Sequence, residues 1–355
     1  MDNKTKYKNI INDYEDTIFA ILGFMNFYRY DDATKSMRND VKVFQGRHLK
    51  RLEQLENKED QSEKDKSKKH SFIEHTITPD ISIVYNGNIG VIGEVKKSFC
   101  NDSDKWIDDF KQLMLYDGNI ISWPTVDGKI SSCELVLLLH YSRAVRVRDY
   151  YLSKKGSGIK FICPFSIIEF QHTEEGNHYF SFRLVEGQLQ DESIHKKLHD
   201  GVEVPMEIFS NIYSQIALYD SEPPIPYLLD IAWRYVVTQI AMQDERFPSL
   251  FKNHKLEVVV DIDAVLDILS ESFSFKQLHG SDIENQPVIP KREWIIRAFD
   301  ALCKAGEAKW LDNTNQRVSI IFRKYDDPLE KFIEICAKYC NEIEDEIQVE
   351  LFEDQ

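Results

Sequence analysis

The feature that most constrains the fold is a predicted β-hairpin that begins just after residue 80. Two short runs rich in β-branched residues, residues 81–85 and 89–95, flank Asn86, Gly87 and Asn88. Asn-Gly between such runs is a strong hairpin signal, because both residue types tolerate a positive φ. We therefore expect an antiparallel pair of strands here, and any larger sheet must form by pairing further strands with this hairpin.

The length of the connecting loop decides which side chains of the hairpin meet. A two-residue loop places Asp80 opposite Gly93, and a three-residue loop places it opposite Glu94. Two facing carboxylates repel each other, so a sheet adopts that pairing only where a divalent cation reverses the effect. We expect the three-residue loop, with a bulge-type turn that uses Gly87 or Asn88.

Further polar residues share faces with this pair. Glu94 and Lys96 lie two residues apart, so on a strand both point to one face of the sheet. Gln112 and Tyr116 lie four residues apart in a predicted helix that ends at Asp117, so both can face one groove. The alternatives are a simple ion pair between Lys96 and Glu94, and ordinary helix-surface positions for the other two residues.

This pattern resembles the PD-(D/E)xK nuclease superfamily, which has the restriction-endonuclease-like fold. The helix element is similar to the Q-x-x-x-Y element found in the exonuclease modules of recombination helicase–nucleases. The resemblance covers residues 77–116. The residues that carry it are Pro79, Asp80, Glu94, Val95, Lys96, Gln112 and Tyr116.

The resemblance implies an α/β fold and a metal-dependent phosphodiesterase. We expect a mixed sheet of five or six strands flanked by helices, in the order helix, hairpin, helix, strand, helix, strand. Asp80, Glu94 and the Val95 carbonyl would bind Mg²⁺, for which Mn²⁺ could substitute. Lys96 would hold or help deprotonate the attacking water, which makes Asp80, Glu94 and Lys96 the expected catalytic residues. Gln112 and Tyr116 would position the phosphate or the water.

A predicted amphipathic helix at residues 6–28 supplies one more candidate, Glu15. Its neighbours on the same helix face include Ile11 and Ile18, and a carboxylate there is costly unless it is paired or metal-bound. Many members of the resembled superfamily carry an additional acidic residue on a helix before the hairpin, so Glu15 is the candidate to complete the metal site. The alternative is a glutamate at the stripe edge that reaches solvent.

Net charge and composition limit which molecules the chain can bind. The 355 residues carry a net charge of −16, which argues against non-specific coating of nucleic acid and requires any such contact to be local. Arg143 and Arg146 share one face of a predicted helix and could grip phosphates, or could belong to a plain solvated face. The six cysteines have no metal-binding spacing and no run of 18 apolar residues occurs, and we expect no signal peptide. We expect a reduced, cytoplasmic protein without a membrane segment; a homo-oligomer is left open.

The predicted organisation has two domains. A charged segment interrupts the first domain; we expect it to begin as a helix at Leu49 and to continue as a mobile loop. Polar and Pro-rich stretches separate the first domain from the second. The expected parts are a nuclease-like domain at 1–190 with its loop at 58–70, a connecting segment at 191–227, a helical winged-helix-like domain at 228–342 and an acidic tail at 343–355.

The second domain is expected to contact a partner. Its predicted recognition helix mixes basic residues with Glu293 and Asp300, which favours a protein or intramolecular contact over DNA. The basic residues are Lys291, Arg292, Arg297 and Lys304. The expected function is a nuclease acting on DNA rather than RNA, in restriction, phage defence or repair. A non-catalytic nuclease-fold scaffold and a winged-helix DNA-binding regulator are the alternatives.

Overall fold

The computed structural model divides the chain into two compact units. The sheet unit is Phe19–Phe209, and the terminal unit combines Met1–Ile18 with Ser210–Gln355. The residues that the structure describes are 2–31, 36–38, 40–43, 49–54, 72–77, 79–86, 88–96, 106–118, 120–122, 130, 132–153, 155–173, 179–205, 223–249, 255–273, 290–323 and 328–337.

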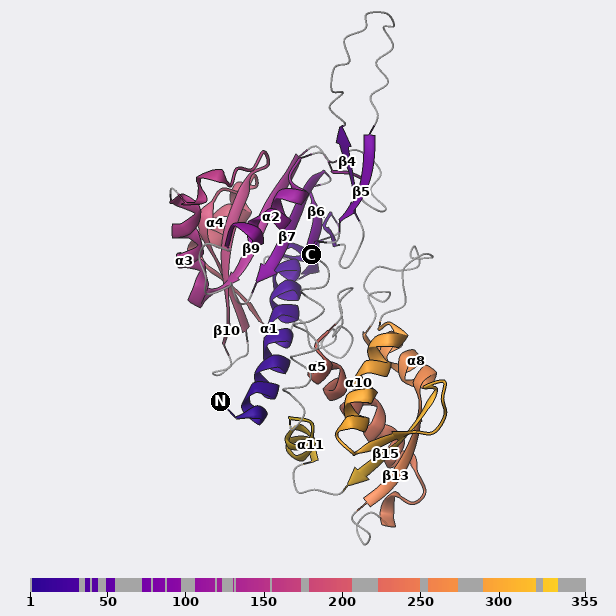
Figure 1. The fold of residues 1–355 in the computed structure, drawn as a ribbon. Helices are drawn as coiled ribbons and strands as arrows, with labels where there is room; N and C mark the ends of the chain where they lie inside the picture. Colours follow the sequence, from indigo (N-terminus) through magenta and orange to yellow (C-terminus); the bar gives the residue numbers. More distant parts are fainter. Residues whose placement is uncertain are drawn as a thin grey trace, which may run out of the picture. The chain divides into compact units, whose positions relative to one another are not determined.

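The sheet unit is a mixed α/β structure built on a seven-stranded sheet of order β12-β11-β10-β9-β7-β6-β3. β7, β9 and β10 run parallel at its centre, and the outer pairs are antiparallel. Figure 1 shows β9, β7 and β6 side by side. Its strands are β3 (Lys42–Val43), β6 (Ile81–Tyr85), β7 (Ile89–Lys96), β9 (Ser132–His140), β10 (Phe165–Thr173), β11 (Tyr179–Gly187) and β12 (Val202–Pro205).

Helices cover both faces of this sheet because successive strand residues point to opposite sides. On one face, the alternate leucines of β9 pack with Phe110 of α2 and Val147 of α3. On the other, Phe24 and Tyr28 of α1 contact Phe182 and Tyr85, with ring centroids 5.6 and 5.2 Å apart. The helices are α1 (Asn3–Arg29), α2 (Trp106–Tyr116), α3 (Tyr141–Leu152) and α4 (Glu192–Asp200), with a short η2 (Lys155–Gly158).

The expected helix, hairpin, helix, strand, helix and strand occur in that order, but further strands stand between the first helix and the hairpin, and the sheet has more strands than expected. Residues 192–205 were expected in a connecting segment, but they form α4 and the edge strand β12, which pairs with β11. The Asp191 carboxylate accepts the N–H groups of Ser193 and Ile194 and so starts α4, a capping signal within the polar stretch.

A second correction concerns the segment that begins at Leu49, which is a strand instead of a helix. It pairs antiparallel with residues on the far side of the charged stretch, and that pairing decides its structure. The small sheet has the order β5-β4-β8, and a separate two-stranded sheet joins β1 and β2. These strands are β1 (Tyr30–Asp31), β2 (Ser36–Met37), β4 (Leu49–Gln54), β5 (Phe72–Ile77) and β8 (Ile120–Ser122). The predicted loop at 58–70 and the acidic tail at 343–355 lie outside the described residues.

In its described part, the terminal unit contains helices and one antiparallel sheet of order β13-β15-β14. The expected helices and the two late strands are present; β13, a run of alternating buried residues, was not expected. Its described elements after α1 are α5 (Ile225–Ala232), the π-helical η4 (Trp233–Val237), α6 (Thr238–Gln243), η5 (Phe247–Ser249), β13 (Lys255–Asp261), α8 (Ile262–Phe273), α10 (Arg292–Lys304), β14 (Ala308–Trp310), β15 (Arg317–Arg323) and α11 (Pro328–Cys336).

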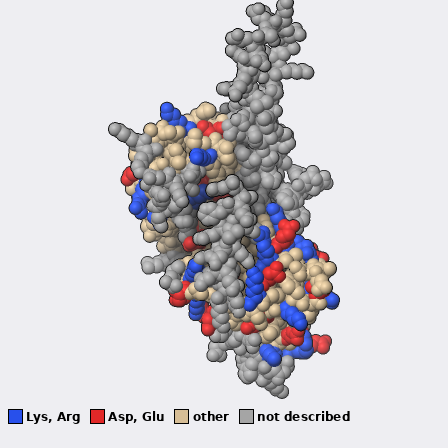
Figure 2. All heavy atoms as spheres, in the orientation of Figure 1, with Lys and Arg blue, Asp and Glu red and all other residues tan. Residues whose placement is uncertain are grey.

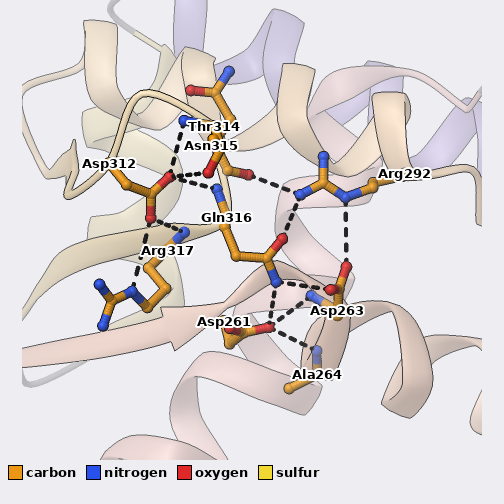
Figure 3. A network of polar contacts seen from close by, with 9 residues as sticks. All are labelled: Asp261, Asp263, Ala264, Arg292, Asp312, Thr314, Asn315, Gln316 and Arg317. Atoms are coloured by element: carbon orange, nitrogen blue, oxygen red, sulfur yellow. Dashed lines mark hydrogen bonds and ion pairs between the residues drawn. The ribbon is translucent and has the colours of Figure 1, made fainter.

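A polar network ties the loop between β14 and β15 to the starts of two helices (Figure 3). Asp312 accepts the N–H groups of Thr314, Gln316 and Arg317 and so shapes the loop. The Gln316 side chain then bonds to Asp261, which begins α8, and to Arg292, which begins α10. Because both helix starts share this one side chain, the loop is held firmly within its own unit.

Charges of both signs are scattered over the described part of the visible surface. In Figure 2, lysine and arginine side chains are interspersed with aspartate and glutamate on the face shown. Among the helices that the structure describes, none combines the length and the apolarity that a membrane crossing requires.

Candidate active site

Four side chains of the sheet unit form a closed ring of polar contacts. The Tyr116 hydroxyl donates to Glu94 Oε1 at 2.5 Å, and Gln112 Nε2 donates to the Tyr116 hydroxyl at 3.2 Å. Lys96 Nζ donates to Gln112 Oε1 at 3.0 Å and lies 3.4 Å from Glu94 Oε2. The structure therefore brings together all four of these sequence-predicted residues.

This ring of contacts follows from the side-chain periodicity of the strand and of the helix that supply its residues. Glu94 and Lys96 are two apart on β7 and share the sheet face on which α2 packs, while Gln112 and Tyr116 are one turn apart on α2. Phe110 and Leu113 hold α2 in place because both are fully buried in the core beneath it. The same apolar packing that seats the helix thus sets the polar groups over the end of β7.

Asp80 joins this group from the neighbouring strand. β6 begins at Ile81, which pairs with Gly93, so Asp80 comes opposite Glu94 at the point where the ladder ends. Asp80 Oδ2 accepts the N–H of Val95 at 2.9 Å. In an antiparallel ladder the N–H and C=O of one residue point to the same neighbour, so the Val95 carbonyl faces the Asp80 side as well.

The predicted three-residue loop is confirmed, because Tyr85 pairs with Ile89. Among the described residues of the loop, Asn86 has a positive φ of 49°, and Asn88, one of the two residues expected to form the bulge-type turn, does not. Asparagine tolerates this region because its short side chain bonds locally. Gly87 itself lies outside the described residues.

Gly93 makes room for backbone next to the site. A Cβ atom at Gly93 would lie 2.7 Å from the Val136 carbonyl oxygen of β9, which is closer than van der Waals contact allows. Glycine at this position therefore lets β7 and β9 pair closely beside Glu94.

Burial and mutual repulsion control the ionisation of the two carboxyl groups. Glu94 is only 2% exposed, and its burial, followed by the charge of Asp80, raises its pKa to about 8. The charge of Lys96 and the Tyr116 hydrogen bond act in the opposite direction. Burial also raises the pKa of Asp80, against the Val95 N–H and the charge of Lys96, which lower it. Two such carboxyl groups at one strand end are stable as a charged pair only beside a cation.

The donor set at this position is compatible with a hard divalent cation. Among the described residues no group of three or more His, Cys, Asp or Glu side chains could hold a metal. Asp80 and Glu94 are two carboxylates, and the Val95 carbonyl would be the third protein oxygen. Mg²⁺ suits such a set, because it accepts one or two carboxylates and keeps several of its waters.

Glu15 is not part of the ring. It belongs to the terminal unit, where its Oε1 lies 3.8 Å from a guanidinium nitrogen of Arg234. Arg234 also bonds to Asp230, a fully buried carboxylate one helical turn away. The structure thus gives Glu15 an ion pair, which is one of the two ways in which a carboxylate on an apolar stripe is stabilised.

Two further acidic residues were not singled out from the sequence. Asp117, only 7% exposed, accepts the N–H groups of Ile162 and Cys163 at 2.6 and 2.9 Å and so anchors the end of α2. Glu134, fully buried on β9, accepts from the Tyr85 hydroxyl and from the Gln190 N–H, and burial raises its pKa to about 7. A lone carboxylate inside an apolar strand was the available signal for Glu134.

Comparison of the chain with protein-family models, with curated proteins and with solved structures finds no match.

Proposed function

We propose that the chain is a metal-dependent nuclease that hydrolyses phosphodiester bonds of nucleic acid, DNA in preference to RNA. The observation that carries the proposal is the ring formed by Glu94, Tyr116, Gln112 and Lys96, with Asp80 facing it across the hairpin. These are the residues through which the sequence resembles the PD-(D/E)xK superfamily. We place the sheet unit in the restriction-endonuclease-like fold for the same reason.

The proposed roles follow from the contacts of each side chain. Asp80, Glu94 and the Val95 carbonyl would hold Mg²⁺ or Mn²⁺, and a bound cation would supply charge stabilisation and a more acidic water. Lys96 Nζ lies between Glu94 and Gln112, so one of its three N–H groups remains for a water or a phosphate oxygen. Its positive charge also offsets the two carboxylates when no substrate is present.

Gln112 and Tyr116 are proposed as positioning residues. The Tyr116 hydroxyl donates to Glu94 and accepts from Gln112, so its direction is set at both ends. Gln112 in turn accepts from Lys96, which orients the ammonium group. Such second partners fix the geometry of metal ligands and typically affect metal affinity or activity about 10–100-fold.

For the terminal unit we propose a winged-helix-like module that contacts protein. The hairpin β14–β15 follows two helices, α8 and α10, as the sequence predicted. The guanidinium of Arg292 is bonded to Gln316, Asn315 and Asp263 of its own unit, so this cation of the proposed recognition helix is already engaged. A gel-shift assay with duplex DNA and EDTA tests this: a metal-independent shift that is lost in Arg297→Gln/Lys304→Gln, two basic residues of the proposed recognition helix, would favour the regulator instead.

The nuclease proposal is tested with the purified chain on supercoiled and linear DNA and on RNA, in Mg²⁺, Mn²⁺ or EDTA. We expect cutting only with metal, and the supercoiled substrate distinguishes internal from terminal cutting. Lys96→Ala should still bind Mn²⁺ in calorimetry while its cutting falls at least about 100-fold, since the lysine is not a metal ligand. A parent protein that neither binds Mn²⁺ nor cuts would favour the scaffold. Cytoplasmic action in restriction, phage defence or repair is the setting we propose.

A further inference from the structure

Two arginines of helix α3, which follows β9 directly, do not belong to the ring of polar contacts but lie on one flank of their helix. Tyr150 is buried on the inner side of α3, and Arg146 and Arg143 precede it by four and seven residues. Helix periodicity places residues at these spacings on one side of the helix. The three side chains therefore share one flank of α3.

That flank is turned toward α2. The Tyr150 ring lies edge-on to Trp106, the first residue of α2, with ring centroids 5.3 Å apart. α3 starts directly after β9, and β9 residue Leu139 is the partner of Lys96 in the sheet. The arginines occupy the first half of α3, so they lie toward the strand ends at which the Lys96 side chain emerges.

The two arginines also differ from their neighbours in their contacts. Arg146 is exposed and Arg143 is half-buried, and no described carboxylate forms an ion pair with either. By contrast, Arg148 on the same helix binds Asp149 at 2.7 Å, and Arg183 of β11 binds Glu169 at 2.6 Å. On a chain with a net charge of −16, cations without such a partner are available to an external anion.

We propose that Arg143 and Arg146 bind the phosphate backbone of the nucleic acid next to the bond that is cut. The inference rests on the proposed nuclease function and adds the path of the substrate, which runs along the α2-facing flank of α3. Guanidinium groups suit this task because their planar N–H pairs match phosphate oxygens. Two arginines one turn apart would contact the backbone without reading its sequence.

The test compares two doubly substituted proteins of equal charge. Arg143→Gln/Arg146→Gln removes the proposed contacts, whereas Arg148→Gln/Arg183→Gln removes two arginines that already have carboxylate partners. Binding of fluorescein-labelled duplex and single-stranded DNA is measured in EDTA over a range of salt concentrations. We expect the first variant to bind at least about 10-fold more weakly. Its slope of log K against log salt should be smaller by about 1.8 for duplex and about 1.4 for single strands.

The control variant should stay within about threefold of the parent, and thermal unfolding checks that both variants are folded. If both variants lost the same amount of DNA affinity, the loss would be explained by the change in net charge alone, and the proposal would be overturned. Unchanged binding by Arg143→Gln/Arg146→Gln, or a parent that binds no DNA, would overturn it as well. Cleavage of DNA by the parent in Mg²⁺ reports separately on the nuclease function, so the two proposals can fail independently.

Discussion

The Tyr116 hydroxyl donates a 2.5 Å hydrogen bond to Glu94 Oε1 and thereby joins helix α2 to strand β7. Glu94 is almost fully buried, so this donor replaces the water that the carboxylate has lost. The same hydroxyl accepts from Gln112, which continues the chain of contacts to Lys96. One phenol group therefore links the ionisation of Glu94 to the position of the lysine.

Tyr116→Phe is expected to lower the rate of metal-dependent cleavage about 10–100-fold, because it removes the donor that orients Glu94. The same change should weaken Mn²⁺ binding, measured by calorimetry. Tyr141→Phe is the matched control, since Tyr141 is 48% exposed at the start of α3. If Tyr116→Phe cut and bound metal like the parent, the ring would have no part in the chemistry.

Metal binding should depend on pH through Glu94. Its pKa is raised to about 8 by burial and by the charge of Asp80, so near neutral pH a cation must displace a proton to bind. We expect Mn²⁺ affinity to rise with pH up to about 8 and then to level off. Calorimetry in buffers of different ionisation enthalpy should detect that Mn²⁺ binding releases close to one proton at pH 6.5 and almost none at pH 9. Proton release that is absent at both values would contradict this account of Glu94.

Glu134 should make the native protein less stable as pH rises. Burial raises its pKa from 4.5 to about 7, so the folded state binds a proton that the unfolded state has released between these values. The free energy of unfolding therefore falls by about 2–3 kcal/mol over that pH interval, because a pKa difference of one unit between the two states corresponds to roughly 1.4 kcal/mol. Urea denaturation at pH 5 and pH 8 measures the loss.

Glu134→Gln should remove most of that difference, since the amide keeps an acceptor for the Gln190 N–H without ionising. Glu203→Gln serves as the control because Glu203 is exposed on the edge strand β12. A Glu134→Gln protein that kept the full parental loss between pH 5 and pH 8 would assign the effect to other groups.

Asp117→Ala is expected to destabilise the sheet unit by about 2–4 kcal/mol, because it leaves the Ile162 and Cys163 N–H groups without their acceptor. Cleavage should fall as well, since Asp117 directly follows Tyr116 and fixes the end of its helix. Asp149→Ala, an exposed residue on α3, should change the free energy of unfolding by no more than about 0.5 kcal/mol. Similar thermal unfolding of the two variants would show that the Asp117 contacts add little.

The hairpin and the ring could be predicted because their geometry is local. Spacings of two on a strand and four on a helix decide which side chains share a face, and the Asn-Gly signal decides where the chain turns. The register of Asp80 against Glu94 was predicted by assuming a cation between the two carboxylates, which favours the three-residue loop over the two-residue loop. Each of these predictions needed only a few neighbouring residues.

The errors involve partners that are distant in sequence. The segment Leu49–Gln54 has charged residues compatible with a helix, but it pairs with Phe72–Ile77 across the charged stretch. Strand β13 likewise finds its partner β15 more than fifty residues later. For Glu15 the sequence indicated an unusual carboxylate, yet its ion-pair partner Arg234 lies on a helix that periodicity could not connect to it. Such pairings are decided by tertiary packing.

The most direct test of the central claim is DNA cleavage by Asp80→Asn beside the parent in Mg²⁺. The amide keeps the size of the side chain and can still accept the Val95 N–H, but it removes one of the two carboxylates proposed to bind the cation. Asp149→Asn, a surface substitution with the same change of charge, is the control. We predict metal-dependent cutting by the parent and the control, and a loss of at least about 100-fold in Asp80→Asn. Cutting that persists in Asp80→Asn, or in EDTA, would contradict the account.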